Sequence, residues 1–292
     1  MYKRVAFVPV FAIVIFVTTT LFPSRAPAAE VLVVADSQLR PAMEIISGIR
    51  KSLGSSLKII SPEEARRGLK GAVDREGARV VVALGKEALA EALALPPGIP
   101  VIFDMVVTPP VITRPNTTGF YLATPVREYS ELIRKHLHSI RQMAVVGSRD
   151  QLTLLGRGEA ASYTVRDTSE FVSRMHQMDS ADAILLLPDT SVLTSAALDE
   201  AYLLSFRKGI PLLGVSERNV KEGALVALVV DMVNVGKLIG AAASKALKGV
   251  DIGQFPPSPP RKFDIYLNTA TARRMKIDIP DEMVGMAKRV YP

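Results

Sequence analysis

An alternation of short apolar strands with amphipathic helices, beginning at residue 31, is the feature that most constrains the fold. Runs rich in Val, Ile and Leu predict strands at residues 31–36, 56–60, 78–85 and 99–107. Between these runs the apolar residues recur at helical spacing, and Ser61 followed by Pro62 predicts a capped helix start. This order predicts a parallel sheet covered by helices on both faces.

The alternation starts again after a segment rich in Pro and Thr at residues 109–125. Further strands are predicted at residues 142–147, 183–189 and 210–216, with helices at residues 126–140, 168–178 and 193–209. The FPPSPP segment at residues 255–260 predicts a rigid connector, followed by a strand at residues 262–268 and a helical tail. Two α/β units predict two lobes, and ligands of such sheets bind beyond the carboxyl ends of the strands.

The N-terminus has the pattern of a secretory signal. Lys3 and Arg4 precede an apolar run at residues 5–22, and an A-P-A sequence ends at Ala28. An uncleaved membrane anchor is the alternative, because a run of this length can just cross a bilayer. Pro9 interrupts the run and the A-P-A sequence fits a peptidase, so we expect cleavage after Ala28 and an exported, soluble mature chain.

Composition narrows the class of protein. The 292 residues include no cysteine, which excludes disulfides, a thiolate metal site, a cysteine nucleophile and a lipid-modified N-terminal cysteine. Without a lipid anchor, an exported chain is best retained in the periplasm of a two-membrane bacterium. Loss of Lys3, Arg4 and Arg25 with the signal lowers the formal net charge from +7 to +4. Together with export, so mild a charge argues against nucleic-acid binding.

Polar residues follow several of the predicted strands, where a ligand would lie. The candidate ligand-binding residues are Asp36, Ser37, Gly85, Lys86, Asp104, Met105, Asp189, Thr190, Ser216, Glu217 and Asp231. Gly85 permits close backbone approach at a helix N-terminus, and Lys86 adds charge, so this pair suits an anionic group. Asp189 and Asp231 suit an amine or hydroxyl. Each candidate could instead cap a helix or lie in a solvated loop.

The Asp189-Thr190-Ser191 sequence has several interpretations. An aspartic protease needs a second such motif and an all-β fold, and a phosphoacceptor aspartate needs further acidic residues for Mg²⁺; the sequence offers neither. Two possibilities stay open. Asp189 contacts a ligand while Thr190 or Ser191 caps the following helix, or Asp189 itself is that cap.

Other catalytic and metal patterns have no support. His136 and His138 are two residues apart, so on a helix they point in different directions and cannot share a metal. No G-x-S-x-G or G-x-G-x-x-G pattern accompanies the predicted strands. We therefore expect no enzyme, no metal and no cofactor.

Several segments of the chain follow the sequence pattern of a known family. The most specific is Asn268-Thr269-Ala270-Thr271-Ala272 followed by I-P and a closing helix. The others are residues 185–200, 209–228, 230–249 and 259–287, and more loosely 80–93 and 99–109. In these segments the chain resembles the ABC-transporter substrate-binding proteins with the type I periplasmic-binding fold, in the branch of tryptophan and tyrosine binders. The resemblance implies two Rossmann-like lobes joined by three crossovers and closing over a ligand. It also implies delivery to a permease with its ATPase, and no catalysis.

The resemblance also sets expected boundaries. The first lobe should hold residues 29–122 and about 233–268, and the second residues 123–232 and about 269–292. Hinges are expected near Tyr121 and Val230, in a chain that acts as a monomer.

This sequence differs from the family pattern in two places, and both differences bear on which ligand the chain binds and on whether it serves transport. The chain has Asp231-Met232-Val233 where the family commonly has an aromatic pair after the aspartate, and residues 148–162 leave room for only a short helix. The alternative function is therefore a sensor or interaction partner of a membrane protein, without transport.

Overall fold

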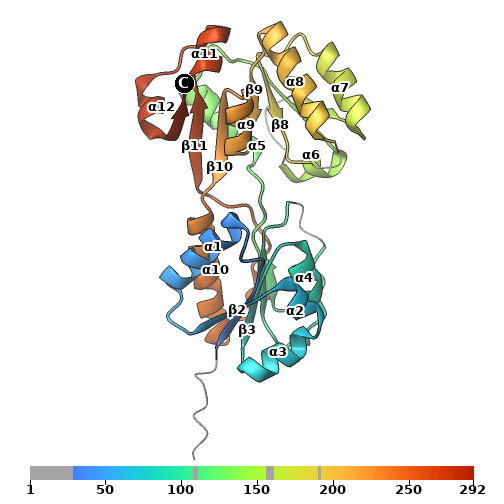
Figure 1. Ribbon diagram of the computed structural model, residues 1–292, viewed down its shortest axis with the longest axis vertical. Coiled ribbons are helices and arrows are strands. Elements are labelled where there is room, and N and C mark those ends of the chain that lie inside the picture. The colour runs from blue at the N-terminus through green and yellow to red at the C-terminus, as the bar shows by residue number, and fades with distance from the viewer. Residues whose placement is uncertain (1–28, 108–110, 156–160, 190–191) are drawn as a thin grey trace, which may run out of the picture.

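The computed structural model describes residues 29–107, 111–155, 161–189 and 192–292, which form two α/β lobes stacked along the long axis (Figure 1). Each lobe holds one sheet of mostly parallel strands with helices packed against it. The predicted two-lobed α/β fold is therefore confirmed. The predicted signal at residues 1–28 lies outside the described residues. No helix in the described part of the chain is long and apolar enough to span a bilayer.

The sheet of the first lobe is parallel, with strand order β2-β1-β3-β4-β5. Its strands are β1 (Val31–Val34), β2 (Leu57–Ile60), β3 (Val80–Leu84), β4 (Val101–Asp104) and β5 (Thr117–Gly119). The central strands β1, β3 and β4 are buried throughout, which explains their unbroken apolar sequences. The short edge strand β5 was not predicted, because its Thr-Thr-Gly sequence carries no apolar run.

Helices cover both faces of this sheet. They are α1 (Arg40–Ser52), α2 (Pro62–Arg66), α3 (Leu69–Glu76), α4 (Lys86–Leu93) and, from later in the chain, α10 (Met232–Leu247), followed by the 3-10 turn η1 (Ile252–Gln254). One apolar cluster joins one face of the sheet to α1 and α10, and a second joins the other face to α2, α3 and α4. Ser61 accepts a hydrogen bond from the Glu64 N–H at 3.1 Å, which confirms the predicted cap.

Glycines bring α1 and α10 into backbone contact. A Cβ atom on Gly236 would lie 2.0 Å from the Ile45 carbonyl oxygen, and one on Gly48 would lie 2.1 Å from the Val233 oxygen. The Ser52 hydroxyl also donates to the Lys237 carbonyl at 3.0 Å across the same crossing. Only residues without a side chain allow this approach, so the glycines fix α10 against the first lobe directly after the chain enters it.

The second lobe holds a mixed sheet of order β12-β11-β10-β9-β8-β6-β7, in which β11 alone runs antiparallel to its neighbour β10. Its strands are β6 (Met143–Gly147), β7 (Ala161–Thr164), β8 (Ala183–Leu186), β9 (Leu212–Gly214), β10 (Val226–Val230), β11 (Phe263–Asn268) and β12 (Ala287–Tyr291). Its helices are α5 (Val126–His136), α6 (Arg149–Leu155), α7 (Thr168–Gln177), α8 (Ser195–Lys208), α9 (Glu217–Glu222), α11 (Thr269–Met275) and α12 (Asp281–Met286). Helix α6 is short, as expected from the short segment after β6.

The chain passes between the lobes at residues 120–125, at Asp231 and at residues 258–262, as the three implied crossovers require. The predicted return to the second lobe after residue 268 is wrong. Strand β11 already pairs with β10, with Phe263 opposite Val230. A strand of this length could pair with either sheet, so its sequence alone did not reveal which lobe it joins.

The chain end also differs from the prediction of a helical tail. After α12, residues of β12 pair in parallel with β11. Its exposed sequence Ala-Lys-Arg-Val-Tyr lacks the apolar alternation of a half-buried strand, so the pattern did not indicate it. Ionic contacts such as Lys288 Nζ to Asp264 Oδ2 at 2.6 Å fix it to the sheet edge instead.

A buried tyrosine on α5 forms hydrogen bonds with two strands of the second lobe. Tyr129 is fully buried, donates its hydroxyl hydrogen to the Gly214 carbonyl at 2.5 Å, and accepts from the Leu228 N–H at 3.1 Å. Burial raises the pKa of Tyr129 far above its usual value, so the hydroxyl stays neutral. This one group thus joins α5 to the end of β9 and to the middle of β10.

Tyr129→Phe should therefore lower the free energy of unfolding by about 1–3 kcal/mol, because it leaves the Leu228 N–H and the Gly214 carbonyl without their buried partner. Urea unfolding would measure the loss. Tyr163→Phe, at a partly exposed edge-strand tyrosine, is the matched control and should change stability by under about 0.5 kcal/mol. Equal stability of the two variants would contradict the assigned role.

Candidate functional site

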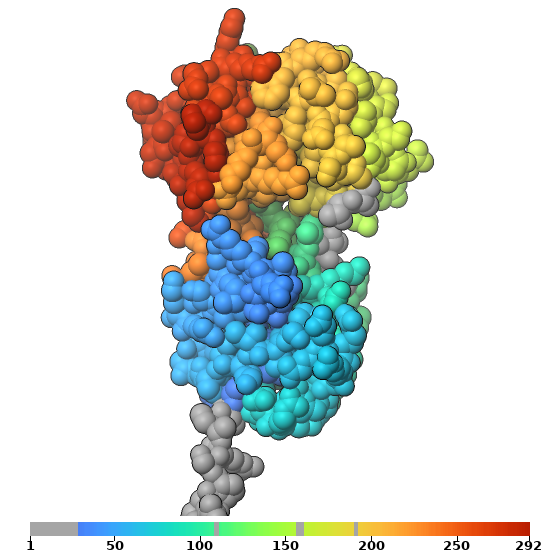
Figure 2. Space-filling view, viewed as in Figure 1, coloured from blue at the N-terminus to red at the C-terminus, as the bar shows by residue number. Residues whose placement is uncertain are grey.

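The carboxyl ends of both sheets face the junction between the lobes. Strand β5 ends at Gly119 and the chain then enters the second lobe, while β10 ends at Val230 and the chain then enters the first. Strands β1 to β4 run parallel to β5, and β6 to β9 run parallel to β10, so their carboxyl ends reach the same junction, whereas β11 and β12 run the opposite way. The space-filling view shows the molecule narrowing at this level (Figure 2). Those predicted residues that the structure describes therefore lie around this junction.

The loop after β1 holds Asp36 and Ser37. Asp36 is half-buried, and its Oδ1 atom accepts a hydrogen bond from the Gln38 N–H at 2.9 Å, while Ser37 is exposed. This turn presents a hydroxyl and one remaining carboxylate oxygen at the carboxyl end of the strand. The loop can contact a ligand without rearrangement of the sheet.

Gly85 and Lys86 form the turn from β3 into α4. Gly85 has a φ of +101°, a conformation that favours glycine, and its N–H donates to the Asp104 carbonyl at 2.8 Å. No atom lies within 4 Å of where its Cβ would stand, and Lys86 is exposed. The turn offers open space, a helix N-terminus and a positive charge, which suit an anionic group.

Asp104, the last residue of β4, is placed differently from the expectation. It was predicted to reach a ligand, but it is completely buried, and neither carboxylate oxygen has a hydrogen-bond partner in the described part of the protein. Burial raises the pKa of Asp104 to about 7. Met105, half-buried beside it, has a φ of +59°, rare for a residue with a side chain.

Asp189 follows β8 in the second lobe and does not cap the next helix. Its backbone carbonyl accepts from the Leu193 N–H at 2.8 Å, and its side chain is half-buried. Helix α8 begins at Ser195 and is capped by Thr194, whose hydroxyl accepts from the Ala197 N–H at 3.3 Å. The alternative that Asp189 itself caps this helix is therefore wrong, because α8 begins six residues later.

Thr190 and Ser191 themselves lie outside the described residues. Ligand contact by Asp189 stays a prediction.

Ser216 and Glu217 start helix α9 after β9. Ser216 and Asn219 form a reciprocal capping box, with the Ser216 hydroxyl accepting from the Asn219 N–H at 3.2 Å. The Glu217 carboxylate accepts from the Tyr291 hydroxyl and from Arg289 at 3.0 Å. The Tyr291 hydrogen bond is the main cause that lowers the pKa of Glu217, with Lys221 and Arg289 adding to it. These partners from β12 tie Glu217 into the second lobe.

Asp231 stands where the chain enters the first lobe. Its Oδ1 atom accepts from the Asn234 N–H at 2.9 Å and caps α10, and its Oδ2 atom lies 3.4 Å from Lys262 Nζ on the third passage. Both contacts involve the passages between the lobes. The structure therefore gives Asp231 a role in the hinge, beside the ligand role that was predicted.

A pocket of about 310 Å³ lies beside this hinge, between the two lobes. It is lined by Arg40, Pro41, Glu44, Glu217, Val229, Val230, Asp231, Met232, Val233, Asp264, Tyr266 and Lys288. Of the predicted residues it contains Glu217 and Asp231. Arg40 was missed because α1 begins with no side-chain cap, Tyr266 because β11 was assigned to the other lobe, and Lys288 because β12 was predicted to be helical.

The pocket has charges of both signs, already paired in part, such as Arg40 Nε with Glu44 Oε1 at 2.8 Å. Within the described ranges no group of three or more His, Asp or Glu residues could hold a metal ion.

Comparisons with known proteins agree with this architecture. Residues 159–291 match the family of ABC transporter substrate binding proteins. A search of curated proteins found no match.

Solved structures cover both lobes. A conserved domain protein from Vibrio cholerae matches 90% of this chain and 99% of its own, at 19% identity and a TM-score of 0.59. An ABC domain in complex with L-Trp from Streptococcus pneumonia has the same coverage, at 18% identity and a TM-score of 0.57. The ligand-free, open structure of a substrate binding protein with adhesive properties from Clostridium difficile also has this coverage, at 12% identity and a TM-score of 0.65.

At these identities the solved structures establish the fold. The matched family is one of solute-binding proteins and not a class of enzymes. The resemblance predicted from the sequence is thereby confirmed: the chain has the two-lobed type I periplasmic-binding fold, and its second half carries the sequence pattern of ABC transporter substrate binding proteins.

Proposed function

We propose that this protein is the periplasmic solute-binding component of an ABC import system and captures a small polar ligand, an amino acid or related carboxylate. The observation that carries the proposal is the meeting of the carboxyl ends of both sheets at the junction between lobes, in a chain whose second half matches this family. Ligand binding would select a closed arrangement of the lobes, which a membrane permease with its ATPase then recognises.

The site would bind the two ends of such a ligand from opposite lobes. Gly85 and Lys86 would hold the anionic end, since they combine open space, a helix N-terminus and positive charge. Asp189, at the end of β8, would accept hydrogen bonds from the amine or hydroxyls. Asp36, Ser37 and Ser216 lie on loops at the same edge and would complete the contacts. No catalysis is proposed.

A thermal-shift screen of the chain without residues 1–28, against amino acids, peptides, sugars and nucleosides, tests the proposal. A ligand at 100 times its Kd adds about 2.7 kcal/mol to native stability, which should raise the Tm by roughly 5–10 °C. Asp189→Ala should remove most of the shift, whereas Asp199→Ala, on an exposed turn of α8, should keep it. If no compound raises the Tm, or Asp189→Ala binds like the wild type, the proposed site is wrong.

A sensor or interaction partner of a membrane protein is the second candidate. It is favoured by the short α6 beside the junction and by the engagement of Asp231 with the hinge rather than with an aromatic neighbour. Genes for a permease and an ATPase beside the gene for this protein would favour import. A binding protein that responds to ligand but has no such neighbours would favour the sensor.

A further inference from the structure

The first passage between the lobes lies directly against the segment that contains Asp104. The Phe120 N–H donates to the Phe103 carbonyl at 2.9 Å, and the Leu122 N–H donates to the Val106 carbonyl at 2.8 Å. Asp104 lies between these two hydrogen bonds. Any motion of the first passage relative to the first lobe must therefore act on the backbone beside Asp104.

The other two passages are joined to this region. The Tyr121 N–H donates to the Ser258 carbonyl at 3.3 Å, and the Ser258 N–H donates to the Gly119 carbonyl at 3.2 Å. On the second and third passages, the Asp231 N–H donates to the Lys262 carbonyl at 3.2 Å. The passages thus form one hydrogen-bonded hinge.

The side chain of Asp104 points to the face of the sheet that α1 and α10 cover. Ile102, two residues earlier on β4, and Leu84, its neighbour on β3, both belong to the apolar cluster on that face. Apolar residues on the first passage, and directly beside the second and third, belong to the same cluster, namely Phe120, Leu122, Val230, Met232 and Phe263. The carboxyl group is therefore buried at the edge of an apolar cluster that the hinge completes.

No charge compensates this carboxyl group. The titratable and charged groups at the ends of the adjoining elements are Asp36 after β1, Lys86 after β3, Tyr121 on the first passage, Asp231 at the start of α10 and Lys262 on the third passage. Burial is the main cause of the raised pKa of Asp104, and no charged side chain contributes to the shift. Burying an ionised carboxylate at the edge of an apolar cluster, without a hydrogen bond, is unfavourable because the charge loses its hydration.

We propose that Asp104 couples the angle between the two lobes to its own protonation. The protonated carboxyl stays within the apolar cluster and keeps the three passages packed against the first lobe. Ionisation requires water at the carboxylate, and the nearest route for water is separation of the apolar residues of the passages from the cluster. A proton is released when the hinge loosens and is taken up when the hinge packs.

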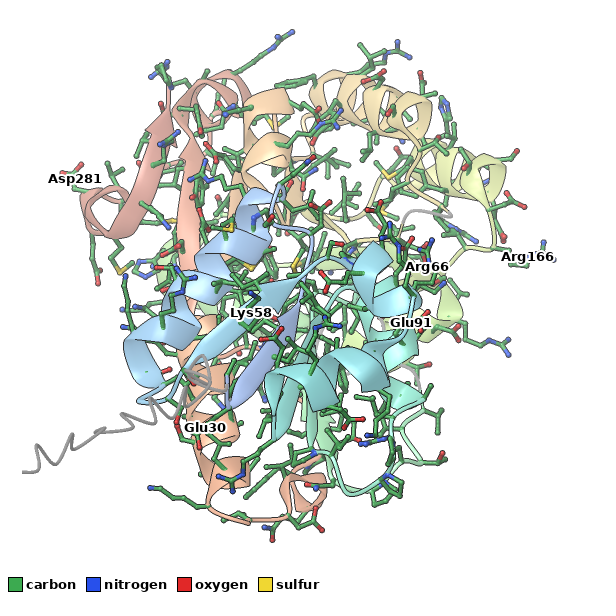
Figure 3. All side chains as sticks on the ribbon, turned by 60° about the horizontal axis from the view of Figure 1, so that its bottom comes forward. Glu30, Lys58, Arg66, Glu91, Arg166 and Asp281 are labelled. Carbon is green, nitrogen blue, oxygen red and sulfur yellow. The ribbon has the colours of Figure 1, made fainter. Side chains whose placement is uncertain are left out.

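Energy transfer between two dyes tests this coupling. Because the full chain contains no cysteine, an Ala90→Cys, Ser173→Cys protein can be labelled specifically, one dye on α4 and one on α7. Both positions are exposed, and Glu91 beside the first and Arg166 before α7 point outward on one side of the molecule (Figure 3). We expect the transfer efficiency to shift between pH 5 and 9 with a midpoint within about one unit of 7.

Asp104→Asn, a neutral residue of the same shape, should abolish this shift, and Asp104→Leu should do the same. Asp199→Asn, which removes an exposed carboxylate of the second lobe, should keep it. All three histidines remain in every variant, so a shift that disappears only in the Asp104 variants does not come from them. A shift that persists unchanged in both Asp104 variants overturns the proposal, as does the absence of a shift in the wild type.

The inference rests on the lobe motion of the proposed function, but the two can fail separately. If a compound raises the Tm and changes the transfer efficiency, yet pH does not, the coupling to protons is wrong and ligand capture stands. If pH changes the transfer efficiency and Asp104→Asn abolishes the change, while no compound raises the Tm, the coupling is supported and ligand capture fails.

Discussion

Gly236→Ala should lower the Tm by roughly 6–12 °C, because the new Cβ atom would lie 2.0 Å from the Ile45 carbonyl oxygen. The contact is with backbone, so no side-chain rotation relieves it, and α1 and α10 must move apart. Overpacking of this kind should cost about 3 kcal/mol, even after the gain of about 1 kcal/mol from placing alanine in a helix. Calorimetry of the variant and the wild type at one pH would measure the loss.

Gly71→Ala is the matched control for this prediction. Gly71 also lies within a helix, α3, but no atom stands within 4 Å of its Cβ position. The control should gain up to about 1 kcal/mol, since only the helix propensity changes. If Gly236→Ala gains stability as Gly71→Ala does, the close approach of α1 and α10 is not required for the fold.

Asp104→Asn should stabilise the protein strongly at alkaline pH and hardly at all in acid. The pKa of Asp104 is about 7 in the folded protein against a reference value of 3.8. The folded state therefore binds this proton more tightly than the unfolded state. The contribution of protonated Asp104 to the free energy of unfolding is fully present below pH 3.8, falls as the pH rises toward 7, and is lost above pH 7. At 1.36 kcal/mol per unit, the loss amounts to about 4 kcal/mol.

The measurement is the Tm of both proteins from pH 4 to 8.5. The difference between them isolates Asp104, because every other group titrates in both. We expect a difference near zero at pH 4 and on the order of 10 °C in favour of Asp104→Asn at pH 8.5. Water entry through the hinge would reduce the Tm difference at pH 8.5, because it would hydrate the ionised carboxylate of the wild type. A difference that does not depend on pH would show that Asp104 is not buried as a neutral acid.

The fold was predictable where local pattern and burial agree. Strands β1, β3 and β8 are buried throughout and have unbroken apolar sequences, so their positions and their parallel order follow from the alternation with helices. Strand β12 and the sheet that β11 joins were not predictable. Their pairing depends on contacts between distant segments, such as Lys288 with Asp264.

The candidate site was predictable in outline only. The sequence located polar residues at the carboxyl ends of strands, and the topology brings those ends to one junction. It could not distinguish an aspartate that caps a helix, such as Asp231, from one that is buried, such as Asp104, or from one in a loop, such as Asp189. These three environments arise from tertiary packing, which no spacing along the chain encodes.

The crossing of α1 and α10 has a consequence for how the protein folds. The hydrogen bond from Ser52 to Lys237 joins residues 185 positions apart. The first lobe therefore stays incomplete until nearly the whole chain is available. Contacts of such long range slow folding, because a large loop must close before they form. For a chain that we propose is exported, slow folding is useful, since it leaves time for the unfolded polypeptide to reach and cross the membrane before either lobe becomes compact.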